Sequence, residues 1–580
     1  MRWRLLGNAA VAAAAASVHV IFLYAFLNPS VGSGGSNLVR LVGGLCPVYT
    51  LTMSLPVASA YLLYGYFGSR PLPRRRVEWR YWGSFFVLLN IWVVVAYGLN
   101  ARFYRYLLDP AALNRLIGAA LAILTASLAV AITVFSRRLA QRSAARMSAL
   151  GIVVTVWLIL AGLLSVDVPE ASPPYRTELE PLASAGPLTI IGIDGLSPEL
   201  LLPLISEGRL PAFARLMREG SYGALRAFPP GDGVTLWTTI LTGKQPHRHG
   251  VRGMLRYRLL GGEAEITLPP HGVGFGFLRT LGLVLPAPIT AEHRRVRAFW
   301  DILSAFRIPS AFLGFPLAPP VSSLPSIQFR AAMDPPTSPA PADLEEWWPR
   351  LVEENSQPMA LQDEVLKRGL AADMLLLEES ERLRSGKPSP RVRVVRLSGF
   401  DYVLHRFLRY HQPSKFGNVP DTALERFGHT ISEYCKFLDV KIAREIEAVG
   451  NRGMLLVVSS HGMTAESIAA RAIRNLRGAA SLSGTHHRGP SGILFMYGPG
   501  VQAGSTLNRA RLTDVLPTLL YLLGLPVARD LDGEPMTEAM TVRHLEATPA
   551  SSIPSYEGVF IGEQIIDTFP EPGEEFPVLD

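Results

Sequence analysis

Cysteine is scarce in this sequence. The two cysteines, Cys46 and Cys435, lie far apart in a chain of 580 residues, which excludes the framework of paired bridges typical of small disulfide-rich domains. No internal repeat of fixed period is evident. Apolar residues, by contrast, make up 48% of the chain, and the mean hydropathy is positive. The length and composition predict more than one domain, with part of the chain in a membrane.

Residues 1–166 lack lysine and almost lack acidic residues. They hold 15 arginines, one aspartate and one glutamate, a net charge of +13, which leaves −5 for the remainder of a chain whose total is +8. The arginines cluster beside apolar runs. Retention of positive charge on the cytoplasmic side of a membrane explains that clustering better than contact with phosphates, so we expect no nucleic-acid partner.

Five long apolar runs occupy the same part of the chain. Each has roughly the 20 residues that a helix needs to cross a bilayer. They are residues 7–28, 42–67, 81–99, 116–135 and 148–166. The first is not interpreted as a cleaved signal peptide, because four more runs follow it and no clear cleavage signal ends it. The sequence therefore predicts an α-helical membrane domain of five spans over residues 1–166.

The loops between these runs predict the orientation of the domain. SRPLPRRRVEWR, after the second run, has five arginines, and SRRLAQRSAARM, after the fourth, has four. With these loops inside, the N-terminus is cytoplasmic and the chain beyond the fifth run is extracytoplasmic, as in an integral protein of the bacterial inner (plasma) membrane. Transport is a poor alternative, because the runs have few polar residues besides His19 and no repeat symmetry.

The rest of the chain is divided by composition. Residues 167–186 are rich in proline, serine and acids and predict a linker, residues 187–545 predict a second domain, and residues 546–580 predict a C-terminal tail. Apolar runs that end in polar residues predict buried strands. The four runs are PLTIIGIDG, VRVVRLSGFD, LLVVSSHGM and GILFMYGPG. Helical patterns lie between them, so we expect an α/β domain with a mainly parallel central sheet.

Metal-ligating residue types follow several of these predicted strands. Asp401 and His405 are four residues apart, so one helical turn presents both on the same face. The full set is Asp194, Asp401, His405, His461 and His486. Each alone has an ordinary explanation, such as a turn for Asp194 or a surface pair for Asp401 and His405. Their convergence at one sheet edge favours a site for Zn²⁺ or a similar transition metal.

Eight motifs follow one another along the second domain: IIGIDG, GRLPAFARLMREGSYGAL, LWTTILTGKQPHRHGV, FWDIL, GFDYVLHRFLRY, SSHGM, SGTHHRGPSGILFMYGPG and DVLPTLLYLLGLPVARDLDGEPM. With these motifs in this order, the sequence resembles the type I phosphodiesterase/nucleotide pyrophosphatase branch of the alkaline phosphatase superfamily, over roughly residues 186–540. Residues 252–298 match less clearly and suggest an insertion over the active-site face. The resemblance implies an alkaline phosphatase-like fold, two metal ions, expected to be zinc, and a Ser or Thr nucleophile.

The resemblance also implies roles for particular residues. One metal site would comprise Asp401, His405 and His486, with His487 as an alternative to the last. The other would comprise Asp194, the nucleophile, an aspartate before His-Gly, and His461. This chain departs from that second pattern at two of the four positions.

Ser460 stands where the family has the aspartate, and counting back four residues from Trp237 gives Gly233 at the nucleophile position. A hydroxyl adds no negative charge to a divalent site, and glycine forms no phosphoryl intermediate. Asp232 is a candidate base, replacement ligand or nucleophile, and Thr235 is a candidate hydroxyl nucleophile. The alternative is that Gly-Asp-Gly is a tight turn and that Thr235 packs inside the following helix.

Two functions follow from these observations. The first is a membrane-anchored, extracytoplasmic, metal-dependent phosphoester hydrolase or phospho-group transferase that acts on lipid head groups or envelope glycans. The second is a degenerate member, a pseudoenzyme, that serves as a binding or scaffold protein because the nucleophile and one carboxylate are replaced. Location at a lipid surface favours the first as an analogy of architecture, and the two replacements favour the second.

Overall fold

The structure is a computed structural model. It describes residues 78–135, 186–259, 282–318, 326–331, 364–417, 419–467 and 482–557, with short stretches between residues 13 and 54 and residues 265–266, 279 and 471. Contacts within the chain divide it into two compact units. The first unit comprises residues 1–171 and 252–289, and the second comprises residues 172–251 and 290–580.

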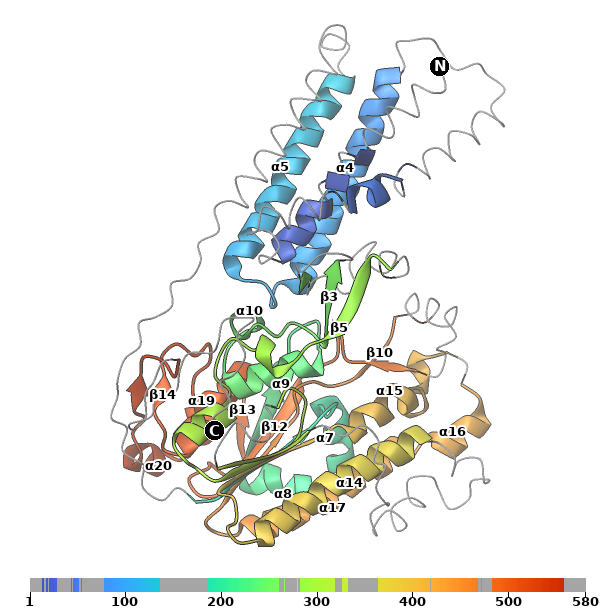
Figure 1. Ribbon diagram of the computed structural model, residues 1–580. Helices are drawn as coiled ribbons and strands as arrows, with labels where there is room; N and C mark the ends of the chain where they lie inside the picture. Colours follow the sequence, from blue (N-terminus) through green and yellow to red (C-terminus); the bar gives the residue numbers. More distant parts are fainter. Residues whose placement is uncertain are drawn as a thin grey trace. The chain divides into compact units, whose positions relative to one another are not determined.

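The described part of the first unit is built on two long helices that pack side by side, α4 (Glu78–Tyr104) and α5 (Pro110–Phe135) (Figure 1). Residues 252–289, which interrupt the second unit in sequence, also belong to the first unit. Their described part forms a small antiparallel sheet of β3 (Leu255–Leu259), β4 (Glu265–Ile266) and β5 (Val284–Pro288), with β3 in the centre.

One helix in the described part of the chain is long and apolar enough to cross a bilayer, by length and composition, over residues 110–129 of α5. It overlaps the predicted span 116–135. The helix α4 covers the predicted span 81–99 without meeting the same criterion. The span 148–166 lies outside the described residues, and the first two are described only in part. Five spans therefore remain a prediction.

An eight-stranded sheet forms the centre of the second unit. Its spatial order is β13-β2-β12-β9-β1-β8-β6-β7. All neighbouring pairs are parallel except those of β12, which runs antiparallel to both β9 and β2. The strands are β1 (Leu188–Ile193), β2 (Ser221–Leu225), β6 (Ser310–Phe315), β7 (Ile327–Ala331), β8 (Val392–Leu397), β9 (Met454–Val458), β12 (Gly492–Tyr497) and β13 (Ser505–Leu507). The prediction of an α/β domain with a mainly parallel sheet is confirmed.

Helices cover both faces of this sheet, which explains why the central strands read as continuous apolar runs. One face packs against α9 (Gly233–Thr242), α12 (Phe299–Ala305) and α19 (Val515–Leu522). The opposite face packs against α7 (Pro198–Ser206), α8 (Pro211–Glu219), α14 (Glu364–Ser385), α15 (Gly399–His411) and α17 (Thr430–Val449), of which α14, α15 and α17 are seen together in yellow and orange in Figure 1. The unit is thus a three-layer sandwich.

Short elements complete the second unit. They are α10 (Pro246–His249), α16 (Asp421–Phe427), α20 (Val542–Ala547), the pair β10 (Thr464–Ala465) and β11 (Gly484–Thr485), and the pair β14 (Val527–Ala528) and β15 (Ser552–Ile553). The last pair extends packed structure beyond residue 545, where the sequence predicts that the domain ends. Ile553 and Tyr556 are buried in the core beside α19, so residues up to 557 belong to the folded unit.

Candidate active site

Three neighbouring parallel strands, β9, β1 and β8, end at the same edge of the sheet. His461 follows β9, Asp194 follows β1, and Asp401 follows β8 at the start of α15. Because β12 is antiparallel, it begins at this edge, and His486 precedes it. The carboxyl ends of parallel strands are where α/β proteins place their ligands, and the topology brings all of these residues to that edge.

Asp401, His405 and His486 form a group that fits a metal ion. One ligand atom from each lies within 4.8 Å of the others. Asp401 Oδ1 and His486 Nδ1 are buried and have no hydrogen-bond partner among the described residues. His405 Nδ1 lies 2.8 Å from the carbonyl oxygen of Gly484, and its Nε2 lies 3.4 Å from Asp401 Oδ2. A carbonyl behind one ring nitrogen orients the other toward a metal, so these donors suit a divalent ion of the zinc type.

The electrostatics of these three residues also suit a cation. Burial raises the pKa of Asp401, but the hydrogen bond and charge of His405 and the charges of His461 and His486 outweigh it and hold the pKa below its usual value. Burial lowers the pKa of His486, and the nearby Asp401 offsets this only in part. The pKa of His405 is raised, because the effect of Asp401 exceeds that of burial. Asp401 is therefore ionised, and the lowered pKa of His486 favours the neutral form that binds a metal. The raised pKa of His405 favours its protonated form, so a bound ion would displace that proton.

Asp194 is placed differently from the other predicted ligands. The residue is 2% exposed, and both carboxylate oxygens have protein partners. Trp237 Nε1 donates to Oδ1 at 2.5 Å, and Arg396 Nη2 donates to Oδ2 at 2.5 Å. The Trp237 ring lies directly on Gly192, where an added methyl group would approach it to 2.4 Å. Residues 192 and 194 share one face of the strand end, so the absence of a side chain at Gly192 leaves room for the indole to reach the carboxylate.

Arg396 comes from β8, next to β1, and is 8% exposed. Its Nη1 donates to the carbonyl oxygen of Gly314 at 3.2 Å, and its guanidinium lies 5.9 Å from the centre of the Trp237 ring. A guanidinium stays protonated in proteins. The site therefore contains a fixed positive charge that is paired with Asp194.

Gly233 is the first residue of α9 and faces this charge. A methyl group in place of its hydrogen would lie 3.6 Å from Arg396 Nη2 and 3.8 Å from His461 Nε2. The His461 ring lies 5.0 Å, centre to centre, from that of His486. His461 therefore lies between the metal group of Asp401, His405 and His486 and the buried pair of Asp194 and Arg396. The position that the resemblance assigns to a nucleophile is therefore beside the site but carries no side chain.

The two serines before His461 differ in their surroundings. Ser459 Oγ accepts from Leu196 N at 3.1 Å and donates to the carbonyl oxygen of His461 at 2.9 Å, which ties the end of β9 to the loop after β1. Ser460 is fully buried, and its Oγ has no hydrogen-bond partner in the described part of the chain. Ser459 thus has a structural explanation, whereas the Ser460 hydroxyl has none.

Asp232 and Thr235 lie at the start of α9. Asp232 is the N-cap, because its Oδ1 accepts from Val234 N at 3.1 Å and from Thr235 N at 3.2 Å. The Thr235 hydroxyl is buried and donates to the same oxygen at 3.5 Å. The neighbouring Gly231 packs against His486, since an added methyl group there would lie 2.5 Å from the His486 carbonyl oxygen, so this turn lies beside the metal group. One oxygen of Asp232 is therefore committed to the cap, and Thr235 is turned toward Asp232.

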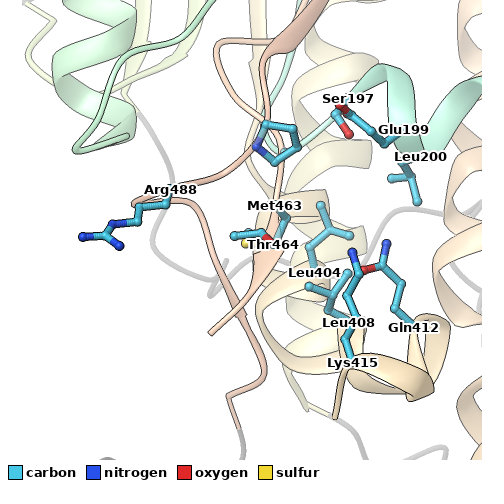
Figure 2. A pocket seen from close by; sticks show the side chains of 12 residues that line it. Ser197, Glu199, Leu200, Leu404, Leu408, Gln412, Lys415, Met463, Thr464 and Arg488 are labelled. Carbon is cyan, nitrogen blue, oxygen red and sulfur yellow. The ribbon is translucent and has the colours of Figure 1, made fainter. Parts of the chain in front are cut away.

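A cavity of about 290 Å³ borders the site (Figure 2). Its lining includes residues that stand next to predicted ligands in sequence, among them Gly195 after Asp194, Leu404 before His405, and Arg488 two residues after His486. Leu408 and Met463 extend an apolar wall. The rest of the lining includes the cationic residues Lys415 and Arg488 and the acidic Glu199, so the cavity is a mixed apolar and polar space.

Sequence reasoning missed Arg396 and Trp237 as site residues. A signal for Arg396 was present, because an arginine inside a strand buried on both faces must be paired with an acid or an acceptor. Arg393, on the same strand, shows that this signal is ambiguous. It pairs instead with Glu445 at 2.9 Å, on the side of α17.

Comparison with known proteins bears on the same part of the chain. Residues 188–519 match the family of type I phosphodiesterases/nucleotide pyrophosphatases. A 2,3-bisphosphoglycerate-independent phosphoglycerate mutase from Cereibacter sphaeroides is 27% identical over 141 residues, which are 24% of this chain and 24% of the mutase. The chain thus spans about a quarter of the length of that curated relative.

Two solved structures also resemble the chain. Murine ectonucleotide pyrophosphatase/phosphodiesterase 5, an inactive variant in complex with AMP, has 12% identity and a TM-score of 0.38, and the match covers 61% of this chain and 100% of that one. The human protein has 12% identity and a TM-score of 0.36, with 62% and 99% covered.

Proposed function

Because the chain belongs to the type I phosphodiesterase/nucleotide pyrophosphatase family, we propose that its second unit is a metal-dependent phosphoester hydrolase or phospho-group transferase. The observation that supports this most strongly is the group of Asp401, His405 and His486, whose donors lie within 4.8 Å of one another at the ligand-binding edge of the sheet. The similarity to a phosphoglycerate mutase points to the same broad chemistry.

The described residues include groups suited to bind a metal ion and the oxygens of a phosphoryl group. Asp401, His405 and His486 would hold a divalent ion, which would supply a Lewis acid for a phosphoryl oxygen. His461 Nε2 and the Arg396 guanidinium flank the space at Gly233 and provide further positive or hydrogen-bonding groups for phosphoryl oxygens. His405 is held in place by the carbonyl of Gly484.

No side chain at Gly233 can accept the phosphoryl group, so we propose direct transfer to an external acceptor. The oxygen of a water or alcohol forms a new bond to phosphorus, and the bond from phosphorus to the ester oxygen breaks. The acceptor loses a proton, and the departing alkoxide oxygen gains one. Asp232 is the candidate base. The cap of α9 engages its Oδ1 and holds the carboxylate in place, and its charge acts on His486 of the metal group.

The substrate class that we propose is a lipid head group or an envelope glycan. Its support is the first unit, where α5 has the length and apolarity of a membrane span and exposed apolar side chains line both helices. These residues are Leu88, Ile91, Trp92, Val95 and Leu99 on α4 and Ile117, Leu121, Leu124, Leu128 and Ile132 on α5. An anchored protein with a cytoplasmic N-terminus and an outer catalytic unit is the arrangement that the arginine pattern predicts.

The cavity beside the site is where we place the part of the substrate that lies beyond the phosphorus. Its apolar wall of Leu404, Leu408 and Met463 suits carbon chains, and its polar lining, which includes Lys415, Arg488 and Glu199, suits hydroxyl-rich groups. A lipid head group with its glycerol offers both kinds of surface.

A binding protein is the second candidate. Gly233 and Ser460 replace reactive or anionic groups, and both oxygens of Asp194 are occupied. The test is hydrolysis of bis(4-nitrophenyl) phosphate by the purified full-length chain in detergent, with Zn²⁺ or Mn²⁺ added.

The matched controls are Asp401→Ala, which removes a ligand, and Asp421→Ala, which changes an aspartate at the start of α16. Turnover that disappears with Asp401→Ala but persists with Asp421→Ala supports the enzyme. A folded chain that binds inorganic phosphate, yet hydrolyses neither this ester nor phospholipids in mixed micelles, supports the binding protein.

A further inference from the structure

The buried pair of Asp194 and Arg396 occupies the half of the site where a second ion would be expected. Asp194 and His461 follow adjacent strands, and a carboxylate and an imidazole at one sheet edge are metal-binding types. The carboxylate, however, already receives a guanidinium at 2.5 Å and an indole N–H at 2.5 Å. Each oxygen thus already accepts a hydrogen bond, and the guanidinium neutralises the negative charge that would attract an ion.

The charges in this half of the site also oppose a second ion. Arg396 Nη2 and His461 Nε2 both lie within 4 Å of the same point, the methyl position of Gly233. An ion bound by His461 would therefore be close to a permanent positive charge in a buried region, where like charges repel strongly. Ser460 adds a neutral hydroxyl in place of a compensating acid, and its buried oxygen has no partner among the described residues.

We infer that the Arg396 guanidinium takes the place of a second metal ion, so that the chain binds one divalent ion and presents the guanidinium to the phosphoryl group of its ligand. The fork of N–H groups on a guanidinium matches two oxygens of a phosphate. Binding of a phosphoryl group by Arg396 rests on the proposed function, whereas the number of ions per chain does not.

The number of ions is measured by titrating the metal-free full-length chain, in detergent, with Mn²⁺ and recording calorimetric stoichiometry and electron paramagnetic resonance spectra. We expect one Mn²⁺ per chain with the six-line spectrum of an isolated ion, and none in Asp401→Ala. Two ions per chain, or the spectrum of a coupled pair, would overturn the inference. Absence of binding in the wild-type chain would overturn it as well.

A double variant tests whether Arg396 is what excludes the second ion. Ser460→Asp combined with Arg396→Ser restores a carboxylate and removes the charge, and we expect a second Mn²⁺ to bind. Ser460→Asp alone keeps the guanidinium and is expected to bind one. A double variant that folds but still binds one ion contradicts the exclusion by Arg396. If the double variant does not fold, two ions in Ser460→Asp contradict it and one ion supports it.

Phosphate binding tests the second part. Arg396→Lys keeps the charge but loses the fork, and we expect the affinity of the Mn²⁺-loaded chain for inorganic phosphate to fall at least tenfold with the ion count unchanged. Arg393→Lys is the matched control, because Arg393 lies on the same strand and pairs with Glu445, away from the site. Equal phosphate affinity in Arg396→Lys and the wild-type chain would overturn this part.

These measurements separate the inference from the proposed function. One bound ion and Arg396-dependent phosphate binding in a chain without turnover sustain the inference and refute the enzyme. Turnover in a chain that binds two ions refutes the inference and sustains the enzyme.

Discussion

The ion pair of Arg396 and Asp194 allows a stability prediction with a defined size. Arg396→Met keeps most of the side-chain length but removes the charge, and it leaves the Asp194 carboxylate, in a residue that is 2% exposed, without its cation. Removal of one partner from a buried pair costs about 3–5 kcal/mol of folding free energy. We expect this loss for Arg396→Met in metal-free buffer.

Addition of Asp194→Asn should recover much of that loss. The amide is neutral, and its oxygen still accepts from Trp237 Nε1, so no unpaired charge remains. The double variant is therefore expected to be more stable than the sum of the single changes predicts, by about 2 kcal/mol or more. This coupling is the quantity that the structure predicts.

The assay is denaturant unfolding of the full-length chain in detergent, followed by tryptophan fluorescence. Arg382→Met is the control, because the Arg382 side chain is 68% exposed and its surface ion pair with Glu379 should contribute far less stability than a buried pair. Unfolding of Arg396→Met at the same denaturant concentration as the wild-type chain, or additivity of the two changes, would refute the buried pair.

Three further predictions concern the surroundings of the site. Gly233→Ser should fold with its free energy of unfolding unchanged or raised by roughly 0.5 kcal/mol, because serine favours a helix more than glycine does. The Cβ of the serine would lie 3.6 Å from Arg396 Nη2 and 3.8 Å from His461 Nε2, which are ordinary contacts. A large drop in melting temperature would contradict this geometry. Trp237→Phe should cost about 1.5–3 kcal/mol through loss of the hydrogen bond to a charged carboxylate, and unfolding equal to wild type would show that the bond is absent. Burial raises the pKa of Asp373 to about 7, against hydrogen bonds from Gly399 N and the Tyr434 hydroxyl. In the unfolded chain Asp373 ionises at a lower pH than in the folded chain, so the free energy of unfolding should fall by about 4 kcal/mol as the pH rises from about 4 to 7. Asp373→Asn should flatten this dependence on pH, and an unchanged dependence would show that other groups cause it.

The sequence predicts the sheet edge well because local patterns determine it. Aliphatic runs such as that of β9 end at polar residues, and the helical spacing of Asp401 and His405 places both on one face. Once three such strands are parallel and adjacent, their ends must meet. The convergence of Asp401 and His405 with other strand-end residues at this edge follows from these facts, whereas the assignment of Asp401, His405 and His486 to one site comes from the family resemblance.

The pairing of Arg396 could not be predicted in the same way. Arg393 and Arg396 look alike in the sequence, and only the positions of Glu445 and Asp194 on opposite sides of the sheet decide their partners. The roles of the two serines before His461 are likewise set by a loop more than 260 residues away in sequence, since Leu196 N reaches Ser459 and not Ser460. Tertiary contacts of this kind leave no local pattern.

The central claim, that one ion held by Asp401, His405 and His486 supports phosphoester chemistry, is tested most directly by titrating activity with metal. The metal-free full-length chain is titrated with Mn²⁺ while hydrolysis of bis(4-nitrophenyl) phosphate is followed. The account predicts that activity saturates at one ion per chain and is lost in Asp401→Ala. Activity that needs a second ion, or that is equal in Asp401→Ala, would contradict it.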